Sequence, residues 1–501
     1  MRGKYIVAIA PPTPNGDLHL GHISGPFLAG DIFARIRRQC KDEVVFVSYS
    51  DECQDYVERK AIQLHQRKQD VFGTYSTRIA ETLKKIDVEL DCFMFSHDNI
   101  HFKNAVKMFY ENAVKANLIG KKWNDVPFIS EGDIYGYEAF AKGKCNYCGT
   151  DSDPSQCEHC AKSPIVDEMG DLTCILNDKV FSTTKVEREY LKLNSTTNLL
   201  AEIYQNRPLR NYLKEYIDEV LADGKLDWFI DRPNSNGIDI EVDGETKIIS
   251  TWFSGIAGYY AATQEVAHQR ADTTLVDSFW KDKNTQIYYF LGFDCSFSHG
   301  IVYPSLLGVS NDFTKNVTPI TNKFLKLEGG DFSTSRGHAI WVNDILESYD
   351  VDGVRFYLAI NSPENEVTNF EMESFDKWYT QIYVPFFQKL NELSLVSKEN
   401  DFIGVYDEVI NVVVRWNKYS HPDHFSIAET AKVCQDLMEI LNNKMDEKDL
   451  YLNTWISLFV VTSKSILVNS TSQLIAKHAI DENEVLDFFT SEKVKSELSY
   501  C

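Results

Sequence analysis

The sequence predicts an α/β protein whose main domain is a doubly wound parallel sheet, interrupted by an insertion and followed by helices. Residues 4–10 (KYIVAIA) and 44–49 (VVFVSY) are continuous apolar runs, which is the pattern of parallel strands buried on both faces. Residues 18–38 lie between them and carry apolar side chains at helical spacing. Strands that alternate with helices in this way are typical of a parallel sheet covered by helices.

The composition is that of an ordinary globular protein. The 501 residues give room for about three domains. The chain carries 51 basic against 74 acidic residues, a formal net charge of -23, which excludes a protein that binds nucleic acid by bulk positive charge. No run approaches the ~20 apolar residues of a membrane span, and the odd number of cysteines, 11, argues against a complete set of internal disulfides. We therefore predict a cytoplasmic protein with no membrane partner.

The alternation of strands and helices breaks near residue 120, where the sequence becomes rich in Gly, Cys, Asp and Ser. Helical spacing returns over residues 186–222, and an apolar run at 286–291 predicts another strand. The interrupting segment is long enough to be a small domain. From residue 372 onward the apolar residues follow a helical pattern. The predicted domains are the sheet domain (1–115 and 225–370), the insertion (116–224) and a helical domain (371–501).

The strongest chemical signal follows the first predicted strand. It is the run Pro-Thr-Pro-Asn-Gly-Asp-Leu-His-Leu-Gly-His, residues 12–22, which opens the first predicted helix. Backbone N–H groups and the helix dipole favour an anion at a helix N-terminus, and His19 and His22 add side chains that can hold phosphate. Gly21 leaves room for a flat base or a ribose close to the backbone. The run therefore predicts a nucleotide site at the end of the strand, where doubly wound proteins bind their ligands.

Four cysteines predict a zinc site within the insertion. Cys145-x2-Cys148 and Cys157-x2-Cys160 are two CxxC pairs separated by eight residues. Four thiolates suit tetrahedral Zn²⁺. Because four protein ligands leave no open position on the metal, we expect a structural zinc knuckle rather than a catalytic zinc ion.

The Asn-Gly-x-x-His-Leu-Gly-His run resembles the HIGH signature of class I aminoacyl-tRNA synthetases, in the form typical of methionyl-tRNA synthetases. The resemblance extends over about residues 4–375. It implies a Rossmann-like catalytic domain that uses ATP, with Mg²⁺, to activate an amino acid and then passes the aminoacyl group to tRNA. It makes His19 and His22 catalytic. The residues that it places in the ATP site are Asn15, Gly16, His19, Gly21, His22, Gly292 and Asp294.

The resemblance also implies an amino acid site. Ser50-Asp51-Glu52 resembles the family's Thr-Asp-Glu segment, whose acidic residue binds the substrate α-amino group, and here Cys53 and Gln54 stand in place of the usual His and Gly. The segment 290–294, followed by His299, resembles the family segment that contacts the adenosine ribose and the amino acid side chain. The amino-acid-binding residues implied are Ala10, Pro11, Thr13, Asp51, Trp252, Ile256, Tyr259 and His299.

Residues 332–337 (FSTSRG) lie where the family's KMSKS loop belongs. The two lysines of that loop are absent, because Asp331 and Thr334 stand in their positions. The second lysine normally stabilises charge that develops on pyrophosphate, a contribution of ~3–4 kcal/mol. Lys323, Lys326 or Arg336 are candidates to replace it. The catalytic residues that the resemblance places in this loop are Ser333, Ser335 and Arg336.

Two further departures concern the substrate and the acceptor. Pro11, Thr13 and Ile256 stand where the family usually has Leu, Tyr and Pro, so we expect methionine or a related amino acid as substrate. The helical domain lacks the family's anticodon-reading motif. Residues 401–501 also carry 9 basic against 16 acidic residues, which is a poor surface for RNA.

Three functions stay open at this point. The first is an aminoacyl-tRNA synthetase that activates its amino acid with ATP and charges tRNA. The second is a biosynthetic paralogue that passes the activated aminoacyl group to a non-tRNA acceptor, or to a tRNA recognised without its anticodon. The third is a non-catalytic protein that senses amino acid or ATP, and the presence of His19, His22, Asp51 and Asp294 argues against it.

Overall fold

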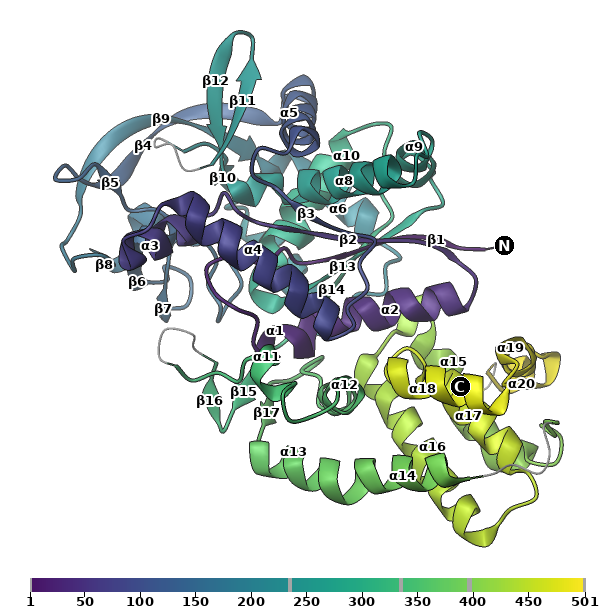
Figure 1. Cartoon of the computed structure of the whole chain (residues 1–501). Coiled ribbons are helices and arrows are strands. Elements are labelled where there is room, and N and C mark those ends of the chain that lie inside the picture. Colours follow the sequence, from purple (N-terminus) through teal and green to yellow (C-terminus); the bar gives the residue numbers. More distant parts are fainter. Residues whose placement is uncertain (1, 233–236, 333–336, 394–398, 499–501) are drawn as a thin grey trace. The chain divides into compact units, whose positions relative to one another are not determined.

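The computed structural model describes residues 2–232, 237–332, 337–393 and 399–498. The chain divides into two compact units, each assembled from separate stretches of sequence. Helix α2 (Leu28–Gln39) belongs to the second unit, although the strands before and after it in the sequence belong to the first (Figure 1). The first unit comprises residues 1–17, 43–81 and 89–322, and the second comprises 18–42, 82–88 and 323–501.

A five-stranded sheet forms the centre of the first unit (Figure 1). Its strand order is β14-β13-β1-β2-β3, and every neighbouring pair is parallel. The first strand lies in the middle and the sheet grows outward on both sides, which confirms the predicted doubly wound α/β fold. The strands are β1 (Lys4–Ile9), β2 (Glu43–Ser50), β3 (Cys92–Phe95), β13 (Gln286–Gly292) and β14 (Val317–Asn322).

Helix α8 packs against β2 and β3 of this sheet. Two glycines on α8 allow large rings to lie against its backbone: a Cβ at Gly255 would collide with the Tyr303 ring, and a Cβ at Gly258 would collide with the Tyr49 ring. The helices of the first unit are α3 (Asp55–Leu64), α4 (Lys68–Lys85, whose last turn belongs to the second unit), α5 (Ile100–Lys115), α6 (Thr197–Tyr204), α7 (Asn211–Asp223), α8 (Thr251–Gln269), α9 (Leu275–Trp280) and α10 (Tyr303–Val309).

Small antiparallel sheets form between α5 and α8. Strands β4 and β9 pair over ten residues, from Ile119 opposite Leu191 to Phe128 opposite Ser182. The predicted helical character is therefore wrong for residues 186–192, because pairing with β4 holds them extended despite apolar side chains at helix-like spacing. The strands are β4 (Ile119–Ile129), β5 (Ile134–Tyr135), β6 (Ala141–Lys144), β7 (Asp151–Ser152), β8 (Gly170–Cys174), β9 (Ser182–Lys192), β10 (Asp227–Phe229), β11 (Ile238–Val242) and β12 (Glu245–Ile249).

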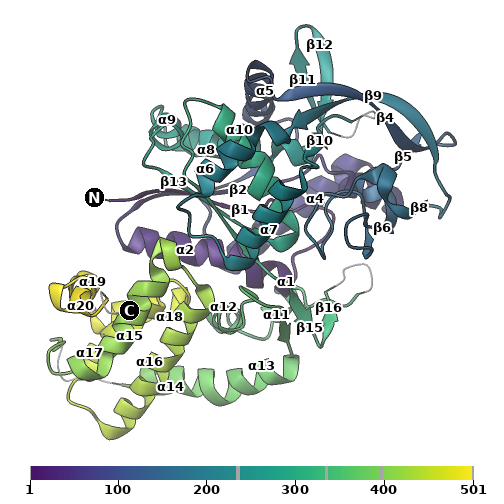
Figure 2. The same ribbon diagram turned by 180° about the vertical axis from the view of Figure 1, so that it is seen from behind.

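The second unit is mainly helical, and α15, α16 and α17 pack side by side (Figure 2). This confirms the predicted C-terminal helices. A small sheet of order β16-β15-β17 precedes them. Within the described residues, no helix has both the length and the hydropathy needed to cross a membrane. The elements are α1 (Leu20–His22), α2, β15 (Leu325–Leu327), β16 (Gly330–Asp331), α11 (Val342–Ile345), α12 (Val351–Ile360), β17 (Thr368–Phe370), α13 (Met372–Trp378), α14 (Val384–Glu392), α15 (Tyr406–Ser420), α16 (Ile427–Glu447), α17 (Leu452–Ser463), α18 (Val468–His478), α19 (Glu482–Phe489) and α20 (Glu492–Leu498).

One buried guanidinium joins several stretches of the second unit. Arg355 on α12 is 0% exposed and donates to Oδ2 of Asp31 on α2 at 2.7 Å. Its remaining N–H groups donate to the backbone carbonyls of residues 86–87 and 465–466 at 2.9–3.0 Å. All five donors of the side chain are therefore used. The contact links the N-terminal helix, the 82–88 segment and the C-terminal helices of this unit.

Arg355→Met should destabilise the second unit by ~3–5 kcal/mol, because it removes the buried one of two arginines that pair with the Asp31 carboxylate and leaves buried carbonyls without donors. Urea unfolding followed by circular dichroism measures the change. Arg67→Met is the matched control: Arg67 pairs with Asp70 on the surface, and exposed pairs contribute little. Equal unfolding midpoints for Arg355→Met and the wild type would contradict the proposed role of this contact.

Candidate active site

The predicted site residues lie in both units. His19, Gly21, His22 and the candidate lysines Lys323 and Lys326 belong to the second unit, whereas the other described candidates belong to the first. Nothing in the structure tests the catalytic roles predicted for three loop residues, because they lie outside the described residues. These are Ser333, Ser335 and Arg336.

His19 and His22 form a stacked pair at the start of the helical segment. His19 is the N-cap of α1 and has an extended backbone (φ -114°, ψ 169°). Its N–H donates to Nδ1 of His22 at 3.1 Å, and the ring centroids lie 3.7 Å apart at an interplanar angle of 24°. Since Nδ1 of His22 accepts a hydrogen bond, the proton of the neutral ring is on Nε2. His22 therefore presents a hydrogen-bond donor at Nε2.

The segments on either side of the predicted loop contact this pair. Phe332 stacks on His19 with a centroid distance of 4.8 Å and an interplanar angle of 16°. Residues 18–20 pair with residues 340–342 through two backbone hydrogen bonds of 3.0 and 3.1 Å. A Cβ at Gly21 would come within 3.0 Å of the His19 ring and 3.2 Å of the Phe332 ring, so a larger residue would separate the two rings. The HIGH-like run and the flanks of the loop therefore meet within the second unit.

Burial keeps both imidazoles neutral. Desolvation, followed by repulsion from His22, lowers the pKa of His19 to about 2. Desolvation also lowers the pKa of His22 to about 4. At neutral pH the pair offers hydrogen-bonding groups rather than positive charge. Nδ1 of His19 is buried and has no hydrogen-bond partner among the described residues, which is typical of a site that a polar ligand completes.

Asp51 follows β2 directly and is only 4% exposed. Its backbone N–H donates to the carbonyl of Pro12 at 3.1 Å, which links the segments that follow β1 and β2. Nε2 of Gln54 donates to Oδ2 of Asp51 at 2.6 Å, whereas Oδ1 is buried without a partner in the described part of the chain. Burial raises the pKa of Asp51 to about 7. A buried carboxyl group with a free oxygen is a suitable site for a cation.

His299 lies at the centre of a buried hydrogen-bond network. Nδ1 lies 3.0 Å from Oγ of Ser298, which itself donates to the carbonyl of Cys295 at 3.0 Å. Because the serine proton is used in that bond, Nδ1 of His299 carries the proton, and Nε2 accepts from the Tyr259 hydroxyl at 2.9 Å. Desolvation lowers the pKa of His299 to about 3. The ring is therefore neutral, and its orientation is fixed from both sides.

Buried tyrosines surround this histidine. The ring centroid of Tyr303 lies 4.6 Å from that of His299, and Tyr289 stacks on Tyr259 at 5.3 Å. Tyr49 contacts Tyr259 edge-on at 5.9 Å. Asp51 is close enough to raise the pKa values of Tyr49, Tyr259 and Tyr303, although burial is the larger cause for each. The result is a buried cluster, largely aromatic, with the carboxyl group of Asp51 close to it.

The remaining predicted amino-acid-binding residues also lie in the first unit. Ile256 is fully buried on α8 and belongs to the same hydrophobic cluster as Tyr259. Trp252 is half-buried at the start of α8. Its indole N–H has no hydrogen-bond partner among the residues that the structure describes. The half-buried residues in the segment after β1 are Ala10, Pro11 and Thr13.

The predicted ribose and ATP segments leave the sheet at neighbouring strands. Gly292 ends β13, and Asp294 follows it as a half-buried residue whose pKa is raised by burial. The N–H of Asn15 donates to the carbonyl of Thr13 at 2.9 Å, and a Cβ at Gly16 would meet no atom within 4 Å. Because β1 and β13 are adjacent and parallel, both segments start from the same edge of the sheet.

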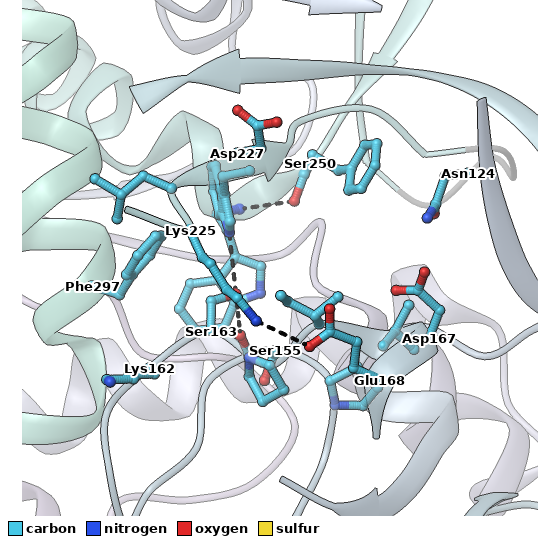
Figure 3. A pocket seen from close by; sticks show the side chains of 18 of the residues that line it. Asn124, Ser155, Lys162, Ser163, Asp167, Glu168, Lys225, Asp227, Ser250 and Phe297 are labelled. Carbon is cyan, nitrogen blue, oxygen red and sulfur yellow. Dashed lines mark hydrogen bonds and ion pairs between the residues drawn. The ribbon is translucent and has the colours of Figure 1, made fainter. Parts of the chain in front are cut away.

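A cavity of about 490 Å³ lies beside Trp252, between the insertion and the segment that leads to α8 (Figure 3). Its lining includes charged side chains that pair with each other: Lys225 lies 3.7 Å from Glu168, and Lys122 lies 3.0 Å from Asp227. Aromatic rings form other parts of the wall. Among the predicted amino-acid-binding residues, Trp252 lines this cavity, and the charges named above are paired with each other.

The four predicted metal ligands converge on one point. The Sγ atoms of Cys145, Cys148, Cys157 and Cys160 all lie within 4.8 Å of one another. Two of the separations are 3.8 Å (Cys145 to Cys160) and 3.6 Å (Cys148 to Cys157). A tetrahedron of thiolates with ~2.3 Å bonds to zinc has edges of ~3.8 Å. The donor set therefore fits Zn²⁺ in both chemistry and spacing.

The two CxxC loops have the same backbone conformation. The N–H of Gly149 donates to the carbonyl of Cys145 at 2.8 Å, and the N–H of Ala161 donates to the carbonyl of Cys157 at 2.7 Å. Gly149 (φ 73°) and Ala161 (φ 58°) both lie in the left-handed region. A non-glycine residue there is uncommon, which indicates that the second loop is held in this shape by its surroundings.

Comparison with known proteins gives the same family as the sequence motifs. The family model of class I tRNA synthetases (M) matches residues 5–382. The chain belongs to this family. Methionine–tRNA ligase of Picrophilus torridus is 30% identical over 379 residues, which are 74% of this chain and 54% of the relative. Methionine–tRNA ligase of Streptococcus pneumoniae is 31% identical over 376 residues, 73% of this chain and 67% of the relative.

The match to the first relatives covers about half of their length: 54% of the Picrophilus enzyme and 55% of the Methanosphaera stadtmanae enzyme. Among solved structures, Mycobacterium tuberculosis methionyl-tRNA synthetase in complex with methionyl-adenylate superposes with a TM-score of 0.70 at 14% identity. That superposition covers 95% of this chain and 93% of the other. This synthetase therefore shares the fold over nearly its whole length.

Sequence reasoning missed several residues of the aromatic cluster around His299. Ser298, Tyr49 and Tyr303 were not predicted, although they orient His299 or belong to the cluster. One signal was present in the sequence: two glycines three residues apart within a helical segment indicate that other groups approach the helix closely. Gly255 and Gly258 are these glycines, and Tyr303 and Tyr49 are the groups that approach.

Cys148→Ser should lower the zinc content from about one per chain and make the insertion sensitive to proteolysis, since three thiolates no longer close the tetrahedron. Elemental analysis and limited proteolysis measure both effects. Cys174→Ser is the matched control, because this thiol is buried in β8 but is outside the four-sulfur cluster. Wild-type protein that contains no zinc when prepared without chelator would contradict the knuckle.

Asp51→Asn should stabilise the unliganded protein at high pH. The folded state raises the pKa of Asp51 from 3.8 to about 7, so the stability associated with the protonated group is complete below pH 4 and is lost as pH rises through 7. Asparagine has no carboxyl proton to lose, so the variant does not lose stability in this way as the pH rises. We expect the variant to exceed the wild type by up to ~4 kcal/mol at pH 8 and to differ little at pH 4.

Thermal unfolding across this pH range measures the difference. Asp272→Asn is a control of opposite sign, because hydrogen bonds from Thr274 lower the pKa of Asp272. A stability difference between Asp51→Asn and the wild type that does not change with pH would show that Asp51 ionises normally.

Proposed function

We propose that this protein activates methionine, or a closely related amino acid, with ATP and transfers the resulting aminoacyl group to tRNA. The observation that carries the proposal is the buried carboxyl group of Asp51, which directly follows β2 and has one oxygen unpartnered among the described residues. The α-ammonium group of an amino acid is the cation that this oxygen would bind. Membership of the class I tRNA synthetase family and the relatives named methionine–tRNA ligase support the same function.

The aromatic cluster around His299 supports a substrate with an uncharged side chain. His299 is neutral, and its ring nitrogens are hydrogen-bonded to Tyr259 and Ser298. Moving a charged side chain from water into such a buried wall would cost several kcal/mol without an opposite charge. A thioether needs no hydrogen bond and suits contact with aromatic rings. Methionine is therefore the first substrate to test.

The neutral imidazoles of His19 and His22 are proposed to donate hydrogen bonds to the phosphates of ATP. An oxygen of the amino acid carboxylate attacks the α-phosphorus, the bond to the bridging oxygen breaks, and pyrophosphate leaves with its charge. Donors fixed in advance stabilise that developing charge. Asp294 is proposed to bind the ribose, and Mg²⁺ accompanies ATP. The loop residues proposed to complete the phosphate site are Ser333, Ser335 and Arg336.

The tRNA acceptor end is proposed to dock on the insertion. Four exposed or half-buried lysines there pair with acidic side chains at distances of 2.7–3.6 Å. Exposed ion pairs contribute at most ~1 kcal/mol, so phosphate groups can replace the acidic partners. The acidic segment 401–501 offers no such basic surface, and we propose that the anticodon is not read. We also propose a cytoplasmic location. The lysines are Lys121, Lys122, Lys142 and Lys144.

ATP–pyrophosphate exchange against a panel of amino acids tests the activation step. One amino acid, methionine or a close relative, should support exchange, and His19→Ala and His22→Ala should each slow it by ~100-fold or more. ATP affinity should change less, because the proposed contribution is to the transition state. His424→Ala, an exposed histidine of the second unit, is the control. The activation step would be refuted if none of the amino acids in the panel supported exchange. Undiminished exchange in a folded His19→Ala protein would refute it as well.

The acceptor is tested by charging full-length tRNA beside an acceptor-stem minihelix. Similar rates for the two, within about tenfold (~1.4 kcal/mol), are expected. A larger preference that depends on the methionine anticodon would contradict recognition through the acceptor end alone. Amino acid activation with no tRNA charging would instead favour the biosynthetic alternative, in which the aminoacyl group passes to another acceptor.

A further inference from the structure

Gln54 contacts Asp51 and keeps a hydrogen-bond acceptor of its own unpartnered. Both residues are 4% exposed. Nε2 of Gln54 donates to Oδ2 of Asp51 at 2.6 Å. Gln54 is the N-cap residue of α3, but its side chain makes no capping hydrogen bond. The side chain is therefore committed to Asp51 rather than to the helix.

Two acceptor oxygens are left over from this contact. Oδ1 of Asp51 and Oε1 of Gln54 are both buried and have no hydrogen-bond partner among the described residues. Buried acceptors without donors are rare in folded proteins. Two of them on directly hydrogen-bonded side chains indicate a missing donor that serves both.

The spacing allows one nitrogen to satisfy both groups. Oε1 and Nε2 of Gln54 belong to one planar amide and are ~2.3 Å apart. With the hydrogen bond of 2.6 Å, Oε1 lies within ~5 Å of Oδ2 and, across the ~2.2 Å between the two carboxylate oxygens, within ~7 Å of Oδ1, a range that includes the separations that one nitrogen can bridge. A nitrogen with charge-assisted hydrogen bonds of ~2.8 Å can bridge acceptors as much as ~5.6 Å apart. An ammonium group, with three donors and a positive charge, matches one anionic and one neutral acceptor.

We propose that Gln54 is a second binding residue for the α-ammonium group of the amino acid. Its Nε2 orients Asp51 through Oδ2, and its Oε1 accepts a hydrogen bond from the ammonium nitrogen that Oδ1 also binds. The inference rests on the proposed function, in which Asp51 receives the α-amino group. It goes further because the family usually has glycine at this position, and glycine has no side chain to bind or orient anything.

The proposal predicts a specific loss in Gln54→Leu. Affinity for L-methionine, or for the amino acid that the exchange panel identifies in its place, should fall by about 10- to 100-fold, the effect of one hydrogen bond to a charged group. Affinity for the deamino analogue, 4-(methylthio)butanoate for methionine, should not change. ATP affinity should also be unchanged. Titration calorimetry measures all three, and Gln63→Leu, on the exposed face of the same helix, is the matched control.

The pH dependence gives an independent readout. The groups that act electrostatically on Asp51 are the hydrogen-bonded Gln54, Lys68 on α4 and Glu52 next in sequence. Tyrosines from β2, α8 and α10 also lie close. Since the Gln54 hydrogen bond favours the ionised carboxylate, Gln54→Leu should move the pH midpoint of amino acid binding upward. A merely structural substitution would leave that midpoint in place.

Gln54→Glu tests the proposal even if the leucine variant does not fold, because glutamate keeps the size of the side chain and an acceptor oxygen. It places a second carboxyl group against Asp51, and one of the two then holds its proton to higher pH. Binding should recover above pH 8 and weaken steeply below it. A pH profile for Gln54→Glu equal to that of the wild type would overturn the proposal.

The outcomes separate this inference from the proposed function. If the wild type activates no amino acid, the proposed function fails and the inference fails with it. If the wild type activates an amino acid but Gln54→Leu binds it equally well, only the inference is overturned. The same conclusion follows if Gln54→Leu weakens binding of the amino acid and of the deamino analogue by equal factors, because Gln54 then makes no specific contact with the ammonium group.

Discussion

The second unit depends on the hydrogen bonds of one buried guanidinium group, that of Arg355. A fully buried cation is stable only when all its donors and its charge are satisfied, and here Asp31 and four carbonyls from other stretches of the chain do so. Asp31 lies on α2, which follows the His19–His22 pair in the same helical segment. The position of the predicted phosphate-binding histidines thus depends on a residue more than 300 positions away in sequence.

The histidines of the candidate site carry no charge at neutral pH. His19, His22 and His299 are all held neutral by burial, and the carboxyl group of Asp51 lies close to the aromatic cluster around His299. Such a carboxyl group destabilises the empty protein and is neutralised when an opposite charge arrives. Buried groups that weaken the fold while they prepare a site for its ligand are a common feature of functional sites. For the amino acid proposed as substrate, this carboxyl group supplies the charged contact at the amino end.

Much of this architecture could be predicted because the signals are local. Apolar runs identified β1, β2 and β13, and the spacing of Cys145, Cys148, Cys157 and Cys160 identified a cluster that the structure brings together. Residues 186–192 were misjudged, since the partner strand that holds them extended lies some 65 residues earlier in the chain. The contact between Gln54 and Asp51 was not visible either, because it depends on the direction of one side chain after β2, which spacing alone does not specify.

The interleaved course of the chain has a consequence for its synthesis. Residues 18–20 pair with residues 340–342, and Arg355 must reach Asp31 before the second unit can close. A ribosome adds about 5–20 residues per second, so His19 waits roughly 15–65 seconds between its own emergence and that of its partners. During this interval the apolar face of α2 has no native partner from the C-terminal stretch. A nascent chain of this protein therefore leaves that face uncovered for much of its synthesis, and its first predicted functional motif is among the last to be completed.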